Sequence, residues 1–141
     1  MNKFQRLALF LSRSGQPDYR LTQIIRNIFV QKEIDFTKMF FLPQQLREKL
    51  EEEFGSWLSI GAIKKDYSSQ AKKILFSLSD NNRIEAVRMT YRDWQSVCLS
   101  SQVGCPLACA FCATGKMGLG RDLTTDEILD QLLFFILKRR G

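Results

Sequence analysis

Apolar residues recur at helical spacing through the first third of the chain. Three helices are predicted, with apolar faces formed by Phe4, Leu7, Ala8 and Leu11; by Leu21, Ile24, Ile25, Ile28 and Phe29; and by Leu46, Leu50 and Phe54. Asp18 stands where the second helix would have its N-cap, and residues 35–41 supply one helical turn before the third. We therefore expect residues 1–58 to form a small helical domain whose apolar faces are its core.

The period changes from helical to alternating after Gly61. Ile74, Phe76 and Leu78 alternate with polar residues, residues 79–82 read as a turn, and residues 84–91 are rich in strand formers. We expect residues 59–93 to form a β-hairpin connector. A third strand is predicted for residues 94–100, with Cys98 on the face opposite to Val97.

The C-terminal third contains a glycine-punctuated loop followed by a helix. Thr124 and Glu127 have the spacing of a capping box, and the predicted apolar face is Ile128, Leu129, Leu132, Phe135 and Ile136. Strand, loop and helix in this order are typical of a β/α unit. The predicted fold class is α+β: a helical domain, a hairpin, and residues 94–141 as the start of a (β/α) barrel.

Composition and charge fit an ordinary globular protein with a basic N-terminal part. The 141 residues are 45% hydrophobic and 26% charged, with a net charge of +6. Residues 1–50 hold nine Lys and Arg against four Asp and Glu, which is compatible with an RNA partner. Arg20 and Arg26 are interpreted as a solvated helix face, with RNA contacts as the alternative. The longest apolar run, Leu132 to Leu137, is six residues, so we expect no membrane partner.

Three cysteines and an aromatic residue form a compact motif, Cys105, Cys109, Phe111 and Cys112. Three thiolates without a fourth suit a [4Fe-4S] cluster that keeps one iron open to a ligand. A zinc site is the first alternative, but it takes four ligands, and the chain has no His and only Cys98 besides these three. Disulfides are the second alternative, and they require an oxidising compartment, whereas no signal peptide is visible.

The residues around this motif resemble the RlmN/Cfr family of radical S-adenosylmethionine (SAM) RNA methyltransferases. The resemblance rests on residues 98–105, 109, 111–115 and 123–128, and upstream on residues 17–20, 42–43 and 46–47, which are similar to the family's N-terminal accessory domain. It spans nearly the whole chain.

The resemblance implies a function. Family members methylate an adenosine of 23S rRNA, at C2 in the RlmN type, which also modifies tRNA, and at C8 in the Cfr type, which gives antibiotic resistance. Residues of both types occur here, and we take C2 as the first hypothesis and C8 as the second. The implied setting is a cytoplasmic monomer that receives electrons from a donor such as flavodoxin or ferredoxin.

The resemblance also implies site residues. Cys105, Cys109 and Cys112 would hold the cluster, Phe111 would lie in the cofactor site, SAM would bind the open iron, and Cys98 would be a catalytic thiol. The alternative for Cys98 is a buried strand cysteine. The family's methyl-carrying cysteine comes later in the chain than these 141 residues. We therefore expect an N-terminal portion that does not complete the reaction alone, or, as an alternative of another class, an inactive RNA-binding fragment.

Overall fold

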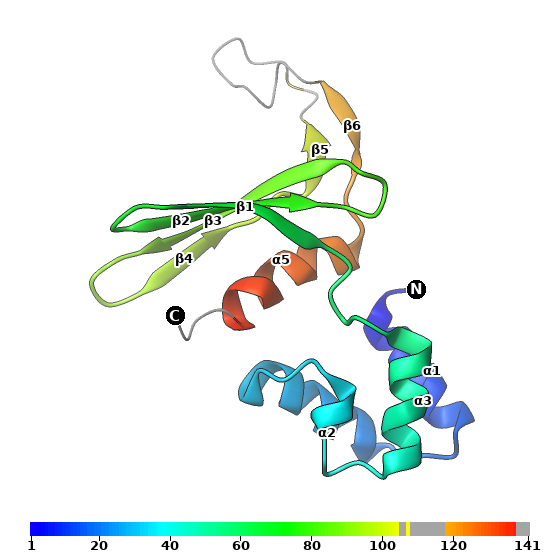
Figure 1. The fold of residues 1–141 in the computed structure, drawn as a ribbon. Coiled ribbons are helices and arrows are strands. Elements are labelled where there is room, and N and C mark those ends of the chain that lie inside the picture. Colours follow the sequence, from blue (N-terminus) through cyan, green and yellow to red (C-terminus); the bar gives the residue numbers. More distant parts are fainter. Residues whose placement is uncertain (105–106, 108–117, 138–141) are drawn as a thin grey trace. The chain divides into compact units, whose positions relative to one another are not determined.

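The computed structural model describes residues 1–104, 107 and 118–137 and divides the chain into two compact units (Figure 1). One consists mainly of Met1–Leu58 and is helical. The other is Ser59–Phe135 and combines strands with a helix. The mixed helix-and-sheet composition agrees with the predicted fold class.

The helical unit contains α1 (Lys3–Arg13), α2 (Tyr19–Arg26), α3 (Gln44–Phe54) and two short turns, η1 (Asn27–Gln31) and η2 (Phe36–Lys38). All three predicted helices are confirmed. An Asn2–Gln5 capping box begins α1. The core is formed by the apolar side chains at helical spacing together with residues of the loops: Leu7, Leu11, Ile24, Ile28, Phe36, Met39, Leu42, Leu46, Leu50 and Trp57.

Two predictions for α2 hold only in part. Asp18 directly precedes the helix, but its backbone is already helical and its side chain makes no capping hydrogen bond. Arg20 is not simply solvated, because its Nη1 atom donates to the Phe41 carbonyl at 3.2 Å and to Gln23 Oε1 at 3.0 Å. Arg26 is exposed, as predicted.

The second unit is built on a four-stranded antiparallel sheet in the order β1-β2-β3-β4. The strands are β1 (Gly61–Tyr67), β2 (Ala71–Ser77), β3 (Arg83–Thr90) and β4 (Gln95–Cys98). The predicted hairpin is confirmed as β2–β3. The edge strand β1 was missed, because it is exposed along its whole length and therefore shows no apolar alternation. The predicted third strand, β4, pairs with β3 in the same sheet.

Helix α5 (Thr125–Leu137) packs on this sheet (Figure 1). The Phe134 ring meets the Phe76 ring of β2 edge to face, with centroids 5.0 Å apart. The predicted apolar face was wrong except for Phe135, since the buried residues are Glu127, Asp130, Gln131, Leu133, Phe134 and Phe135. The prediction considered only apolar positions, whereas Glu127, Asp130 and Gln131 are buried because their polar atoms make hydrogen bonds. Over the described ranges, no helix is long and apolar enough to cross a membrane.

A second, two-stranded sheet pairs β5 (Gln102–Gly104) with β6 (Leu119–Asp122) in antiparallel fashion. The sequence predicted a loop through Gly118 and Gly120 that led directly to the helix. That prediction was wrong, because Leu119–Asp122 form a strand that stands between the cysteine motif and α5. In the chain, residues 105–117 connect β5 to β6.

Candidate functional site

The cysteine segment begins and ends at neighbouring positions of one β-ladder. Gly104 is the partner of Leu119 in the β5–β6 pairing, so the chain enters and leaves residues 105–117 side by side. Gly104 has a positive φ of 77°, and a Cβ atom there would collide with the backbone carbonyl of Gly118. The close approach of these two glycine backbones requires that residue 104 has no side chain.

The predicted ligands Cys105, Cys109 and Cys112, with Phe111, lie outside the described residues, and their roles stay predictions. Across residues 1–104, 107 and 118–137, no group of three or more His, Cys, Asp or Glu side chains could hold a metal ion. The donor set of the motif itself, three thiolates in eight residues, fits a [4Fe-4S] cluster with one open iron.

Cys98 ends β4 and is exposed. Its partner across the ladder is Val87 of β3. The alternative of a buried strand cysteine was therefore wrong. An accessible thiol is what thiol exchange requires.

The link between Cys98 and β5 is held by a buried glutamine of α5. Gln131 Oε1 accepts from the Ser100 N–H at 2.9 Å, and Gln131 Nε2 donates to the Ser100 carbonyl at 2.9 Å. The same Nε2 donates to the Glu127 carbonyl at 3.2 Å. Gln131 is 0% exposed. Its amide thus pairs with the backbone N–H and carbonyl of Ser100 as a residue of a neighbouring strand would.

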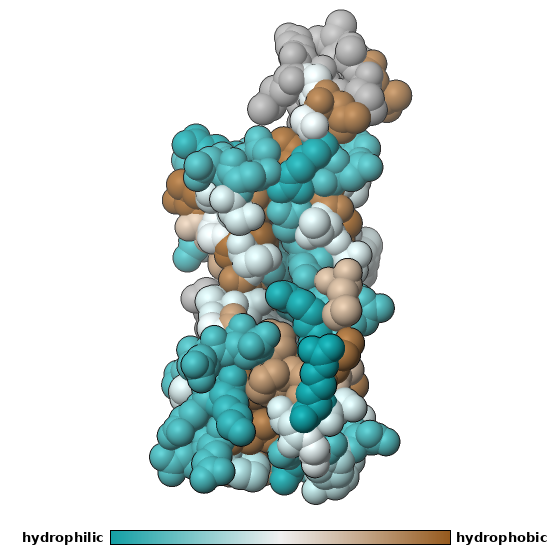
Figure 2. All heavy atoms as spheres, turned by 90° about the vertical axis from the view of Figure 1, so that its right-hand side faces the viewer, coloured by the Kyte–Doolittle hydropathy of each residue, from teal (hydrophilic) through white to brown (hydrophobic). Residues whose placement is uncertain are grey.

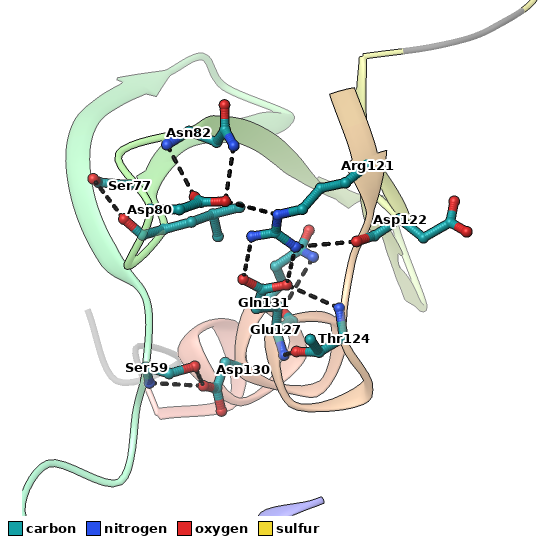
Figure 3. A network of polar contacts seen from close by, with 11 residues as sticks. Ser59, Ser77, Asp80, Asn82, Arg121, Asp122, Thr124, Glu127, Asp130 and Gln131 are labelled. Atoms are coloured by element: carbon teal, nitrogen blue, oxygen red, sulfur yellow. Dashed lines mark hydrogen bonds and ion pairs between the residues drawn. The ribbon is translucent and has the colours of Figure 1, made fainter. Parts of the chain in front are cut away.

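Arg121 links strand β6 to the β2–β3 turn and to helix α5 (Figure 3). Arg121 of β6 donates from Nη1 and Nη2 to the two carboxylate oxygens of Glu127, at 2.9 and 2.8 Å, and from Nε to Asp80 Oδ2 at 2.7 Å. Glu127 also accepts from the Thr124 N–H at 2.8 Å, and the Thr124 hydroxyl accepts from the Glu127 N–H at 3.2 Å, which confirms the predicted capping box.

The electrostatics of this network favour its charged form. Hydrogen bonds from Arg121 lower the pKa of the Glu127 carboxyl, and the same guanidinium with Asn82 lowers that of Asp80. The two carboxylates in turn raise the pKa of Arg121. The network therefore connects β6, the β2–β3 turn and the first turn of α5 at ordinary pH.

Sequence reasoning missed Gly104, Arg121 and Gln131. The available signal for Gln131 was its spacing, because it lies four residues after Glu127 in a helix that is otherwise apolar. Arg121 carried no signal, since Asp80 is 41 residues away in the sequence and Glu127, six residues away, lies in a different element.

Comparisons with known proteins bear on the whole chain. Residues 2–55 match the family described as the ribosomal RNA large subunit methyltransferase N-terminal domain. The ribosomal RNA large subunit methyltransferase Cfr of Bacillus velezensis is 45% identical over 139 residues, which are 97% of this chain and 40% of that protein. The resemblance to the RlmN/Cfr family is confirmed. The Cfr protein of Shouchella clausii is 46% identical over 138 residues, 96% of this chain and 39% of that protein.

The fold agrees with this resemblance. A crystal structure of a radical SAM methyltransferase from Sphaerobacter thermophilus matches with a TM-score of 0.84 and 35% identity, over 99% of this chain and 40% of that one. The chain spans about 40% of the length of the curated relatives it matches.

Proposed function

We propose that this chain is the N-terminal part of a radical SAM methyltransferase that modifies an adenosine of 23S rRNA. The observation that carries the proposal is the three-cysteine motif, set between two paired strands in a chain 45% identical to an rRNA methyltransferase. Helix α5, the four-stranded sheet and the paired strands β5 and β6 supply a scaffold for the motif, while the radical chemistry belongs to the cofactor.

In this proposal Cys105, Cys109 and Cys112 hold a [4Fe-4S] cluster, and Phe111 lies against the cofactor site. A [4Fe-4S] cluster held there, together with SAM and an electron from a donor such as flavodoxin or ferredoxin, would supply the radical chemistry. Cys98 would assist removal of the ring proton and would release the product by forming a disulfide with the methyl-carrying cysteine of the complete protein, as the bond between that sulfur and the product carbon breaks. Its exposure at the end of β4 supports access to substrate.

The position of methylation is C8 or C2 of the adenine. The names of the similar curated relatives favour the Cfr type and hence C8. C2 methylation, the first hypothesis from the sequence, is the second candidate here. Mass mapping of 23S rRNA, after expression of the complete reading frame in a host that lacks both methylations, separates the two positions. The Cys98→Ala variant is the control. Unmethylated adenosine with the intact protein would refute the proposal.

The helical unit is proposed to contact RNA. Tyr19 and Phe40 are 55% and 78% exposed, and each ring lies beside a guanidinium, of Arg20 at 5.2 Å and of Arg47 at 5.1 Å. Exposed aromatic rings next to cations suit stacking on bases and contact with phosphates. Figure 2 shows hydrophilic and hydrophobic side chains interspersed over one face of the molecule.

Binding measurements test the RNA contact. Phe40→Ala should weaken binding of a short single-stranded RNA by about fivefold or more, because base stacking contributes about 1–3 kcal/mol. Val30→Ala, which removes another exposed apolar side chain of the same unit, should not. Affinity should fall steeply with salt. Equal effects of the two variants, or binding that ignores salt, would contradict an RNA-binding role.

A further inference from the structure

Helix α5 buries polar residues where its sequence offers apolar ones. Asp130 and Gln131 are each 0% exposed, whereas Ile128, Leu129 and Leu132 are only partly buried. A leucine at position 131 would fill a core position without desolvating an amide. The buried amide therefore needs an explanation other than burial of apolar surface.

The contacts of Gln131 supply that explanation. Ser100 lies between the end of β4 and the start of β5, where its backbone pairs in neither ladder. Gln131 satisfies both the N–H and the carbonyl of Ser100. The Ser100 hydroxyl donates to the Glu85 carbonyl of β3 at 2.6 Å, and the Leu123 N–H donates to the Ser101 carbonyl at 2.9 Å. The segment is thus held from the helix, the sheet and the linker that follows β6.

We propose that Gln131 is a positioning residue that fixes the path of residues 99–101 and thereby sets where Cys98 stands relative to Gly104, at which β5 ends. Only the role of Cys98 rests on the proposed function. The two hydrogen bonds are made to the peptide groups on either side of the Ser100 Cα atom, and together they restrain the position and orientation of the backbone there, which a packed apolar side chain at 131 would not do. Removing them frees the stretch that joins the exposed thiol to β5.

Asp130 provides a matched control on the same helix. It is equally buried, but its Oδ2 accepts from the N–H and the hydroxyl of Ser59, at 2.8 and 2.7 Å. Those contacts hold the chain that enters β1 and do not touch the Cys98 segment. Gln131→Met removes the hydrogen bonds at similar volume, while Asp130→Asn disturbs a buried polar contact elsewhere.

The first test uses the chain with Cys105, Cys109 and Cys112 changed to Ser, so that Cys98 is the only thiol. Gln131→Met should accelerate exchange of the Ser100 amide hydrogen about tenfold or more, and should change the rate of Cys98 alkylation by iodoacetamide severalfold. Asp130→Asn should change neither, even where it lowers the melting temperature as much. Equal effects of both variants, or unchanged Ser100 exchange and Cys98 alkylation in Gln131→Met, would overturn the proposal.

Gln131→Glu makes the contact between residue 131 and Ser100 depend on pH, which would not happen if residue 131 only filled space in the core. A protonated Glu can both donate and accept as the amide does, whereas the ionised form cannot donate. The ionised form therefore leaves the Ser100 carbonyl facing a carboxylate oxygen, so the chemical shift of that carbonyl carbon should move towards wild type as the pH falls through the variant carboxyl's pKa. A carbonyl shift that does not change with acidification would contradict the pairing. None of these measurements uses a cluster, so failure of wild type to bind iron would refute only the proposed function.

Discussion

Replacing Arg121 by Met should destabilise the second unit by about 2 kcal/mol. Breaking a buried ion pair costs about 3–5 kcal/mol when one charge stays buried, and exposed pairs contribute about 0–1 kcal/mol. The Glu127 side chain is 9% exposed but that of Arg121 is 32% exposed, which places this pair between the two cases. Glu127 also keeps its hydrogen bond from the Thr124 N–H, which limits the loss.

Urea unfolding followed by circular dichroism measures the effect, with Lys73→Met as the control. Lys73 pairs with Glu85 at 3.1 Å, and both side chains are about half exposed, at 50% and 51%. Its loss should cost less than about 0.5 kcal/mol. The reasoning is refuted if Arg121→Met lies within that margin of wild type, or if the two variants lose the same free energy.

Two further predictions concern Gly104 of β5 and the stability of the protein at acidic pH. Gly104→Ala should reduce the iron bound after anaerobic reconstitution, because the new Cβ would collide with the Gly118 carbonyl. Gly61 has open space around it, so Gly61→Ala should bind iron as wild type does. Equal iron contents of the two variants would contradict this prediction. Because the pKa values of Asp80 and Glu127 are lowered in the folded state, their stabilisation is complete above their ordinary values of 3.8 and 4.5 and is lost as the pH falls through the lowered ones. Wild type should therefore lose unfolding free energy more steeply below about pH 4.5 than Arg121→Met, and parallel profiles would count against the network.

The sequence predicted the elements whose burial follows a simple period. The helices around Leu7, Ile24 and Leu50 and the β2–β3 hairpin are present because one face of each is apolar and buried. Strand β1 escaped prediction because neither of its faces is buried, and the face of α5 was misassigned because Gln131 and its polar neighbours are buried with partners far away in the chain.

The candidate site divides in the same way. The ligand motif and Cys98 were visible in sequence because thiolate chemistry depends on residue type and spacing. The supports at Gly104, Arg121 and Gln131 depend on three-dimensional contacts between β5, β6 and α5, which local patterns do not encode. The resemblance could name the chemistry, but it could not show how the base of the motif is held.

Iron and sulfide analysis after anaerobic reconstitution tests the central claim most directly, in wild type and in two cysteine variants. Wild type should bind about four iron and four sulfide ions per chain with the broad brown absorption of a [4Fe-4S] cluster. Cys109→Ala should lose it, because a ligand is gone, while Cys98→Ala should keep it, because that thiol lies outside the ligand set. A colourless protein with stoichiometric zinc, or a cluster that survives in Cys109→Ala and disappears in Cys98→Ala, would contradict the account.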